Sequence, residues 1–187
     1  NRYTLNVNAR ADGSSMVGKD NRWGFFPSVS LSWDVMKEPF MKRQTVFSRL
    51  ILRTGYGLTG NLGAISSYNS LNMLRPDGAI PWNGSTAVTY STKLNVNPDL
   101  KWETRGTFNI GADMGFWHDR LIVTAEYYYS RTWDMLYEYD VPVPPFTYNK
   151  LRTNLGKIAN KGLEIGANVT PGQQRDMKQN VSMNMSF

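Results

Sequence analysis

The chain contains no cysteine among its 187 residues. This absence excludes small disulfide scaffolds, thiolate metal sites and redox-active cysteine pairs. Long apolar runs are also missing, because no purely aliphatic stretch is longer than Leu50 to Leu52, whereas a membrane-spanning helix needs about 20 apolar residues. A helical membrane protein is therefore excluded, although 41% of the residues are hydrophobic.

Histidine and clustered positive charge are scarce as well. The one histidine, His118, stands beside Asp119 in a predicted turn, so we expect a solvated side chain rather than a metal ligand or a catalytic base. Lysine and arginine outnumber the acidic residues 21 to 15, but they never form a run of three. We therefore expect no metal, no cofactor and no nucleic-acid partner.

What the sequence has is a hydrophobic period of two that recurs along the chain. In the longest such segment Phe108, Ile110 and Met114 alternate with Asn109 and Asp113. Alternation of this kind predicts strands with one apolar and one polar face. The seven predicted strands lie within residues 3–10, 25–33, 49–56, 107–116, 121–130, 163–169 and 181–187.

The connections between these segments alternate in length. Residues 11–23, 58–101 and 132–160 form longer loops after the odd strands, whereas residues 117–120 and 171–179 are shorter. Bacterial outer-membrane barrels combine long extracellular loops with short periplasmic turns. We therefore expect odd strands that run outward, and a turn of helix in the remaining connector, residues 35–46.

Two architectures fit an all-β pattern, a membrane barrel and a soluble β-sandwich. Aromatic residues gather near the ends of the predicted strands, as the two interfacial girdles of a barrel require. Glu103, Arg105, Asn109 and Asp113 lie on one face of a single strand, which suits a polar lumen. These features favour the barrel, and a secreted β-sandwich that binds carbohydrate stays open as the alternative.

Motifs for catalysis or cofactor binding are weak. Gly55, Gly57 and Gly60 match a dinucleotide-binding spacing, but no helix pattern follows them, so we expect a strand end. Glu138 and Asp140 are a carboxylate pair without a predicted cleft. We expect no enzyme activity.

Three aromatic residues of the long loops are the candidates for ligand contact: Trp82, Tyr90 and Tyr148. Each can stack on a sugar ring, or else pack within its own loop.

Four sequence blocks carry a resemblance to a known family. They are DGSS at 12–15 with NRWGFFPSVS at 21–30, LRTGYGLTGN at 52–61, NPDLKWE at 97–103 and NKGLE at 160–164. Their content and order resemble the barrel of SusC/RagA-type TonB-dependent outer-membrane transporters. Gly55 replaces the serine or threonine that the family usually has before the tyrosine.

This resemblance implies the fold and function that we expect. Residues 1–187 would be part of the C-terminal β-barrel domain, about seven strands of a barrel of roughly 22, with the plug domain and the remaining strands absent and Asn1 and Phe187 as internal boundaries. The complete protein would import oligomeric nutrients, glycans or peptides, across the bacterial outer membrane. Its implied partners are a SusD-like surface lipoprotein, the TonB complex and outer-membrane lipid.

Overall fold

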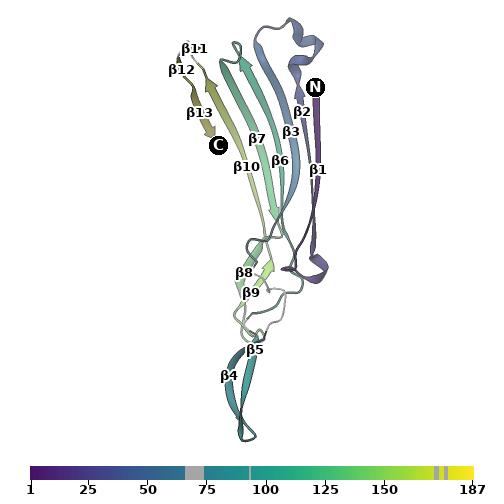
Figure 1. Ribbon diagram of the computed structural model, residues 1–187, viewed down its shortest axis with the longest axis vertical. Helices are drawn as coiled ribbons and strands as arrows, with labels where there is room; N and C mark the ends of the chain where they lie inside the picture. Colours follow the sequence, from purple (N-terminus) through teal and green to yellow (C-terminus); the bar gives the residue numbers. More distant parts are fainter. Residues whose placement is uncertain (66–73, 93, 171–172, 175–176) are drawn as a thin grey trace.

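The computed structural model describes residues 1–65, 74–92, 94–170, 173–174 and 177–187. Its main feature is one tall, curved antiparallel sheet of seven strands (Figure 1). The strands are β1 (Tyr3–Gly13), β2 (Trp23–Asp34), β3 (Phe47–Asn61), β6 (Glu103–Phe116), β7 (Leu121–Trp133), β10 (Lys157–Val169) and β13 (Val181–Ser186). All seven strands predicted from the alternating pattern are confirmed.

The sheet is a meander in which each strand pairs with the previous and the next one, in the order β1-β2-β3-β6-β7-β10-β13. A bulge interrupts the register of β3 and β6 between Phe47 and Arg49, while β6 and β7 pair without interruption from Thr104↔Trp133 to Phe116↔Leu121. This topology is that of an up-and-down barrel wall.

The two faces of the sheet differ as the alternation predicts. The register aligns Leu31 with Leu5, and Ile110 with Tyr127, so the apolar side chains of the seven strands lie on one face. Its side chains are uncovered, with Val7 71% and Ile110 51% exposed. We call this the outer face and the opposite, polar one the inner face. Because the described residues place no second sheet over the outer face, the arrangement differs from a sandwich.

Two hairpins interrupt the meander, and both lie in segments that we expected to be plain loops. β4 (Leu74–Trp82) pairs with β5 (Ser85–Thr92), and β8 (Leu136–Asp140) pairs with β9 (Lys150–Asn154). The expectation failed because apolar and polar residues do not alternate cleanly there. In the first hairpin an Asn83-Gly84 turn, with both φ positive, supplies the tight reversal that antiparallel strands need.

The connections gather at opposite ends of the sheet (Figure 1). We call the end with both hairpins the loop end; η1 (Lys19–Asn21) lies there in the connection between β1 and β2. We call the other the turn end, where residues 117–120 link β6 to β7. The predicted turn of helix in residues 35–46 is confirmed as η2 (Val35–Lys37) and η3 (Pro39–Arg43). No helix in the described part of the chain is long and apolar enough to cross a membrane.

A two-stranded ribbon of β11 (Gln173–Gln174) and β12 (Met177–Lys178) lies between β10 and β13. It falls within the connection predicted at residues 171–179, of which residues 171–172 and 175–176 lie outside the described part of the chain.

Candidate functional site

The loops at the loop end have a small hydrophobic core of their own. Val17, Ile65 and Leu100 come from different connections and are buried together, with Leu100 wholly inaccessible to solvent. Met16, Leu62, Trp102 and Leu136 pack around them. Burial of this kind excludes water between the loops and gives them a fixed arrangement.

The segment 97–102 connects the loops through its backbone and its side chains. The amide of Gly18 donates to the carbonyl of Leu100 at 2.8 Å, and Asn97 Nδ2 donates to the carbonyl of Arg152 at 3.0 Å. Lys101 forms an ion pair of 3.0 Å with Asp134. Each of these contacts joins this segment to a different part of the chain, so it holds the loop end together.

Two asparagine side chains complete the connection to the β8–β9 hairpin. Asn154 donates to the carbonyls of Lys101 and Asp134, both at 2.8 Å, and accepts from the amide of Lys101 at 2.9 Å. Asn95 accepts a 3.2 Å bond from the amide of Tyr148 and donates to the carbonyl of Lys150 at 2.8 Å. Composition alone does not reveal these roles, although Asn97 to Trp102 belong to a block that carried the family resemblance.

The inner face carries a charged network at mid-sheet. Arg53 on β3 lies 2.9 Å from the carboxylate of Asp113 on β6 and 3.6 Å from that of Glu126 on β7. Asn109 donates to Glu126 at 3.3 Å. Three neighbouring strands thus share one polar cluster on the face opposite Ile110, as expected for a water-filled lumen.

A cavity of about 500 Å³ adjoins this network, lined by Arg53, Glu126, Glu164 and Asn184 among others. Glu164 forms no ion pair with any described residue. The inner face therefore offers both charge and hydrogen-bonding groups to whatever passes through or fills the lumen.

The three candidate aromatic residues do not form one binding surface. Trp82 is paired with Ser85 at the tip of the β4–β5 hairpin and Tyr90 with Pro76 lower on it, and alternation places the two aromatic side chains on opposite faces. They are 69% and 61% exposed. Tyr148 is half-buried and fixed by Asn95 at the base. The hairpin projects beyond the β8–β9 hairpin (Figure 1).

The glycines with dinucleotide-like spacing lie within β3 and have another use. A Cβ added at Gly55 would lie 2.7 Å from Oδ1 of Asn109, and one at Gly57 3.1 Å from Cβ of Ser28. A Cβ at Gly60 would overlap the ring of Phe26, which is itself buried. These glycines make room for neighbouring side chains, and in the described residues that follow them no helix begins that could hold a phosphate.

The remaining candidates for catalysis or metal binding are the carboxylates Glu138 and Asp140 and the single histidine. Glu138 pairs with Arg152 at 3.0 Å and Asp140 with Lys150 at 3.3 Å, so each carboxylate is neutralised by its neighbour across the hairpin. His118 stands exposed in the turn of residues 117–120. The described residues contain no group of three or more potential metal ligands.

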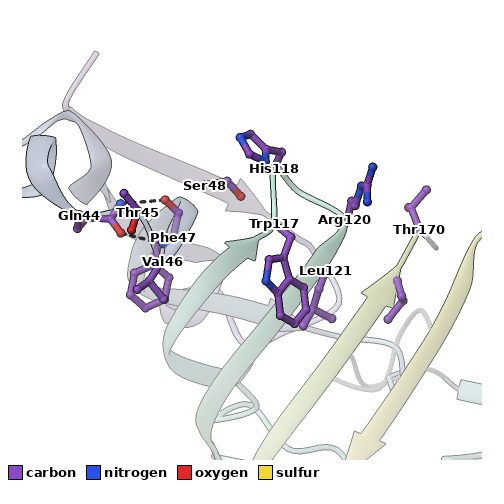
Figure 2. Close-up of a pocket in the computed structure, with 11 residues that line it drawn as sticks. Gln44, Thr45, Val46, Phe47, Ser48, Trp117, His118, Arg120, Leu121 and Thr170 are labelled. Carbon is purple, nitrogen blue, oxygen red and sulfur yellow. Dashed lines mark hydrogen bonds between the residues drawn. The ribbon is translucent and has the colours of Figure 1, made fainter. Parts of the chain in front are cut away.

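A second cavity, of about 1020 Å³, lies at the turn end between residues 44–48, the 117–120 turn and the end of β10. Figure 2 shows Trp117 and Leu121 on one side of the sheet and His118 at the turn itself. Phe47, Leu121 and Val169 belong to the outer face, so this cavity opens toward the apolar side and is separate from the lumen.

Comparison with known proteins agrees with this geometry. A family model described as "TonB dependent receptor-like, beta-barrel" matches residues 1–186. The chain belongs to this TonB-dependent receptor β-barrel family. Its members are outer-membrane proteins, so the outer face of the sheet is the lipid-facing one and the inner face is the one toward the lumen. The expected fold class, a segment of a transmembrane β-barrel, is confirmed.

Named relatives place the chain within this receptor family more closely. It is 35% identical to the TonB-dependent receptor SusC of Bacteroides thetaiotaomicron over 100% of this chain and 19% of that protein. It is 34% identical to the TonB-dependent receptor P26 of Formosa agariphila over 90% of this chain and 17% of that protein. The resemblance to SusC/RagA-type transporters is thereby confirmed, and the chain spans about a fifth of the length of these relatives.

Solved structures give the same result. The RagAB peptide importer in its "closed-closed" state matches with a TM-score of 0.85 and 28% identity, over 99% of this chain and 20% of that one. The "open-open" state matches with a TM-score of 0.83 and 30% identity over the same shares. These relatives are receptors and transporters rather than enzymes.

Proposed function

We propose that the chain forms wall and outer loops of a TonB-dependent importer that takes up oligomeric nutrients, glycans or peptides. The observation that carries this proposal is the amphiphilic meander, whose apolar face spans seven strands while the opposite face holds the Arg53, Asp113 and Glu126 network. Such a wall separates lipid from an aqueous passage. The similarity to SusC and to the RagAB peptide importer supports the two substrate classes.

The complete protein supplies the strands that close the barrel and the plug domain. Open edges at β1 and β13 leave unpaired backbone groups, which in hydrocarbon cost several kcal/mol each, so further strands close the barrel. Residues 1–187 are then part of a C-terminal barrel domain, with a plug domain elsewhere in the protein that fills the lumen and couples to the TonB complex.

The loop end is the part that meets nutrient and partner. Trp82 and Tyr90 stand exposed on the projecting β4–β5 hairpin, and aromatic faces bind sugar rings and apolar peptide side chains. Tyr148 lies at the base of the hairpins, where its amide donates to Asn95. A SusD-like surface lipoprotein covers this end of the barrel, the end from which the β4–β5 hairpin projects (Figure 1).

This chain performs binding and passage and catalyses no reaction. Glu138 and Asp140 are each paired with a basic side chain of the opposite strand of the β8–β9 hairpin, so the two carboxylates serve the hairpin rather than a shared catalytic site. His118 lies in the turn between β6 and β7 (Figure 2), at the turn end, whereas the loop aromatics lie at the loop end.

The proposal is tested in the complete importer in its native outer membrane. Replacing both Trp82 and Tyr90 by alanine should reduce uptake of the importer's glycan or peptide several-fold while the barrel still assembles. Phe40→Ala is the matched control, because Phe40 is 66% exposed but lies in η3 at the turn end. Its uptake should equal that of the wild type.

Two further results bear on the proposal. Uptake should stop when TonB is deleted, and the importer should co-purify with a surface lipoprotein. Uptake that continues without TonB would contradict the proposed function as a TonB-dependent importer. Normal uptake with the double alanine variant would remove Trp82 and Tyr90 from the nutrient path.

A further inference from the structure

The outer face of the sheet carries very few charges, and they are all in one place. We consider the positions of β1, β2, β3, β6, β7, β10 and β13 that share the face of Ile110, every one of which the structure describes. Among them only Arg131, Lys157 and Lys161 are charged, and all three are basic. An otherwise apolar face of seven strands thus has a single, positively charged patch.

These three residues are neighbours across the β7–β10 pair. The register aligns Arg131 with Ala159, Lys157 with Trp133 and Lys161 with Tyr129, so Arg131 lies diagonally opposite each of the two lysines on one face, at about 7–8 Å. The two lysines lie on either side of Ala159 along β10, about 13 Å apart. All three are exposed. We call them the basic patch, and it lies at the loop end of the sheet.

The basic patch has no acidic partner among the described residues. Asp134 is the one acidic residue beside it, and Asp134 is engaged by Lys101 at 3.0 Å. Since a charged lysine or arginine on a lipid-facing position is destabilising near mid-membrane and tolerated near the interface, the three side chains are placed where headgroups begin. Their mutual repulsion calls for an anion between them.

A cavity of about 490 Å³ adjoins the patch, with Arg131 and Lys157 at its rim. Its floor is aromatic, made by Tyr56, Phe108, Tyr129 and Trp133. Gly106 is part of the floor, where an added Cβ would lie 3.1 Å from the Trp133 ring and 3.1 Å from the Tyr56 hydroxyl. The missing side chain lets the indole lie close against the strand, which gives the cavity a flat apolar surface.

We propose that this cavity and the basic patch bind a phosphorylated glycolipid of the outer leaflet, of the lipid A class. The phosphate lies among Arg131, Lys157 and Lys161, since clustered basic side chains at a membrane interface bind lipid phosphates. The sugar ring that bears the phosphate stacks on the aromatic floor, and the acyl chains continue down the apolar outer face. The site is outside the lumen and therefore independent of the nutrient path.

The choice of a glycolipid follows from position and chemistry together. The long hairpin-bearing loops of a barrel are extracellular, so the loop end faces the outer leaflet. A simple phosphodiester lipid satisfies the basic residues but leaves the four-residue aromatic floor without a ring to stack on. Phosphatidylglycerol binding is therefore the main competing outcome of the test.

The test uses the complete importer in nanodiscs made with a neutral lipid. Bisphosphorylated lipid A, its dephosphorylated form and phosphatidylglycerol are each added, and retained lipid is counted by native mass spectrometry. The triple variant Arg131→Gln, Lys157→Gln, Lys161→Gln is compared with Lys42→Gln, Arg43→Gln, Arg120→Gln. The second variant removes the same charge from exposed residues outside the basic patch.

We expect the wild type and the second variant to retain bisphosphorylated lipid A at least tenfold better than the dephosphorylated form, and the first variant to lose this preference. Folding is checked on gels by the difference in migration between unheated and heated samples of the barrel. Gly106→Val is a further variant, which fills the aromatic floor and leaves the charges intact. It should also weaken retention.

Several results would overturn the proposal. Equal retention of dephosphorylated lipid A would mean that only the apolar face is recognised. Equal retention of phosphatidylglycerol would mean a general anionic-lipid site. Displacement of lipid A by millimolar inorganic phosphate would mean a free-anion site, and equal loss in the two triple variants would mean that net charge alone decides.

Discussion

The Tyr3 hydroxyl donates a 2.7 Å hydrogen bond to Oε1 of Glu38 and so fastens the first strand to the connector at the turn end. The Trp33 indole N–H donates to the same oxygen at 3.1 Å, and Arg2 lies 3.5 Å from the other. The Tyr3 bond is the largest cause that lowers the pKa of Glu38 below its usual value, with the Trp33 bond and Arg2 acting in the same direction and partial desolvation opposing them.

A carboxyl group whose pKa is lower in the folded than in the unfolded state stabilises the fold above its unfolded pKa, and that contribution is lost as pH falls through the folded pKa. The denaturant concentration at the midpoint of unfolding should therefore fall between pH 7 and pH 3 in the wild type. In the Glu38→Gln variant it should fall less over the same pH range. Tyr3→Phe should have little further effect in the Glu38→Gln background. A Glu38→Gln variant with the full wild-type dependence on pH would refute this role.

Leu100→Ala should loosen the loop end while leaving the sheet intact. Leu100 is wholly buried between Val17 and Ile65, and truncating a buried leucine costs about 2 to 5 kcal/mol. Hydrogen exchange at the Gly18 amide, which donates to the Leu100 carbonyl, should accelerate accordingly. Leu94→Ala is the control, since Leu94 is 48% exposed. Equal acceleration in both variants would argue against a loop core.

Asn154→Asp tests the polar half of the same arrangement. The substitution keeps the acceptor for the Lys101 amide but removes both donated bonds, which should cost about 1 to 3 kcal/mol. The β8–β9 hairpin should then open more often, seen as faster exchange of the Leu155 amide. Asn149→Asp should leave exchange unchanged, because Asn149 is exposed; the reverse order of effects would contradict the assignment.

The orientation of the sheet can be checked with single cysteines, since the natural sequence has none. Asp77→Cys and Asn149→Cys lie in the loop-end segments 58–101 and 132–160 and should react on whole cells with a membrane-impermeant thiol reagent. His118→Cys, in the turn at the opposite end, should react only after the outer membrane is opened. Labelling at 118 together with silence at 77 would invert the topology.

The strands of the sheet could be predicted because each obeys one local rule. Alternation such as Phe108, Asn109 and Ile110 is readable without knowing the partner strand. The strand ends were predicted less well. β7 runs to Trp133 and β10 begins at Lys157, whereas the predicted segments were residues 121–130 and 163–169. The basic patch lies in those extensions, and only the register reveals that Arg131 and Lys157 share a face.

The contacts at the loop end could not be predicted from the sequence for a similar reason. Leu100 and Val17 are far apart in the chain, and nothing in either neighbourhood indicates that they meet. Asn97 and Asn154 are unremarkable turn residues by composition, yet their amides satisfy backbone groups of distant segments. The loop aromatics were named as candidates, but the opposite directions of Trp82 and Tyr90 depend on the hairpin register.

The central claim is that one face of this sheet meets lipid and the other meets a polar lumen, and the neighbours Ile110 and Asn109 test it most directly. In the complete barrel, folded into phospholipid vesicles, Ile110→Arg should lower the unfolding free energy by about 2 to 4 kcal/mol if the site is near mid-membrane. Asn109→Arg should change it by less than about 1 kcal/mol, because the new cation lies beside Glu126 on the polar inner face. Equal costs at the two positions, or a larger cost at Asn109, would contradict the account.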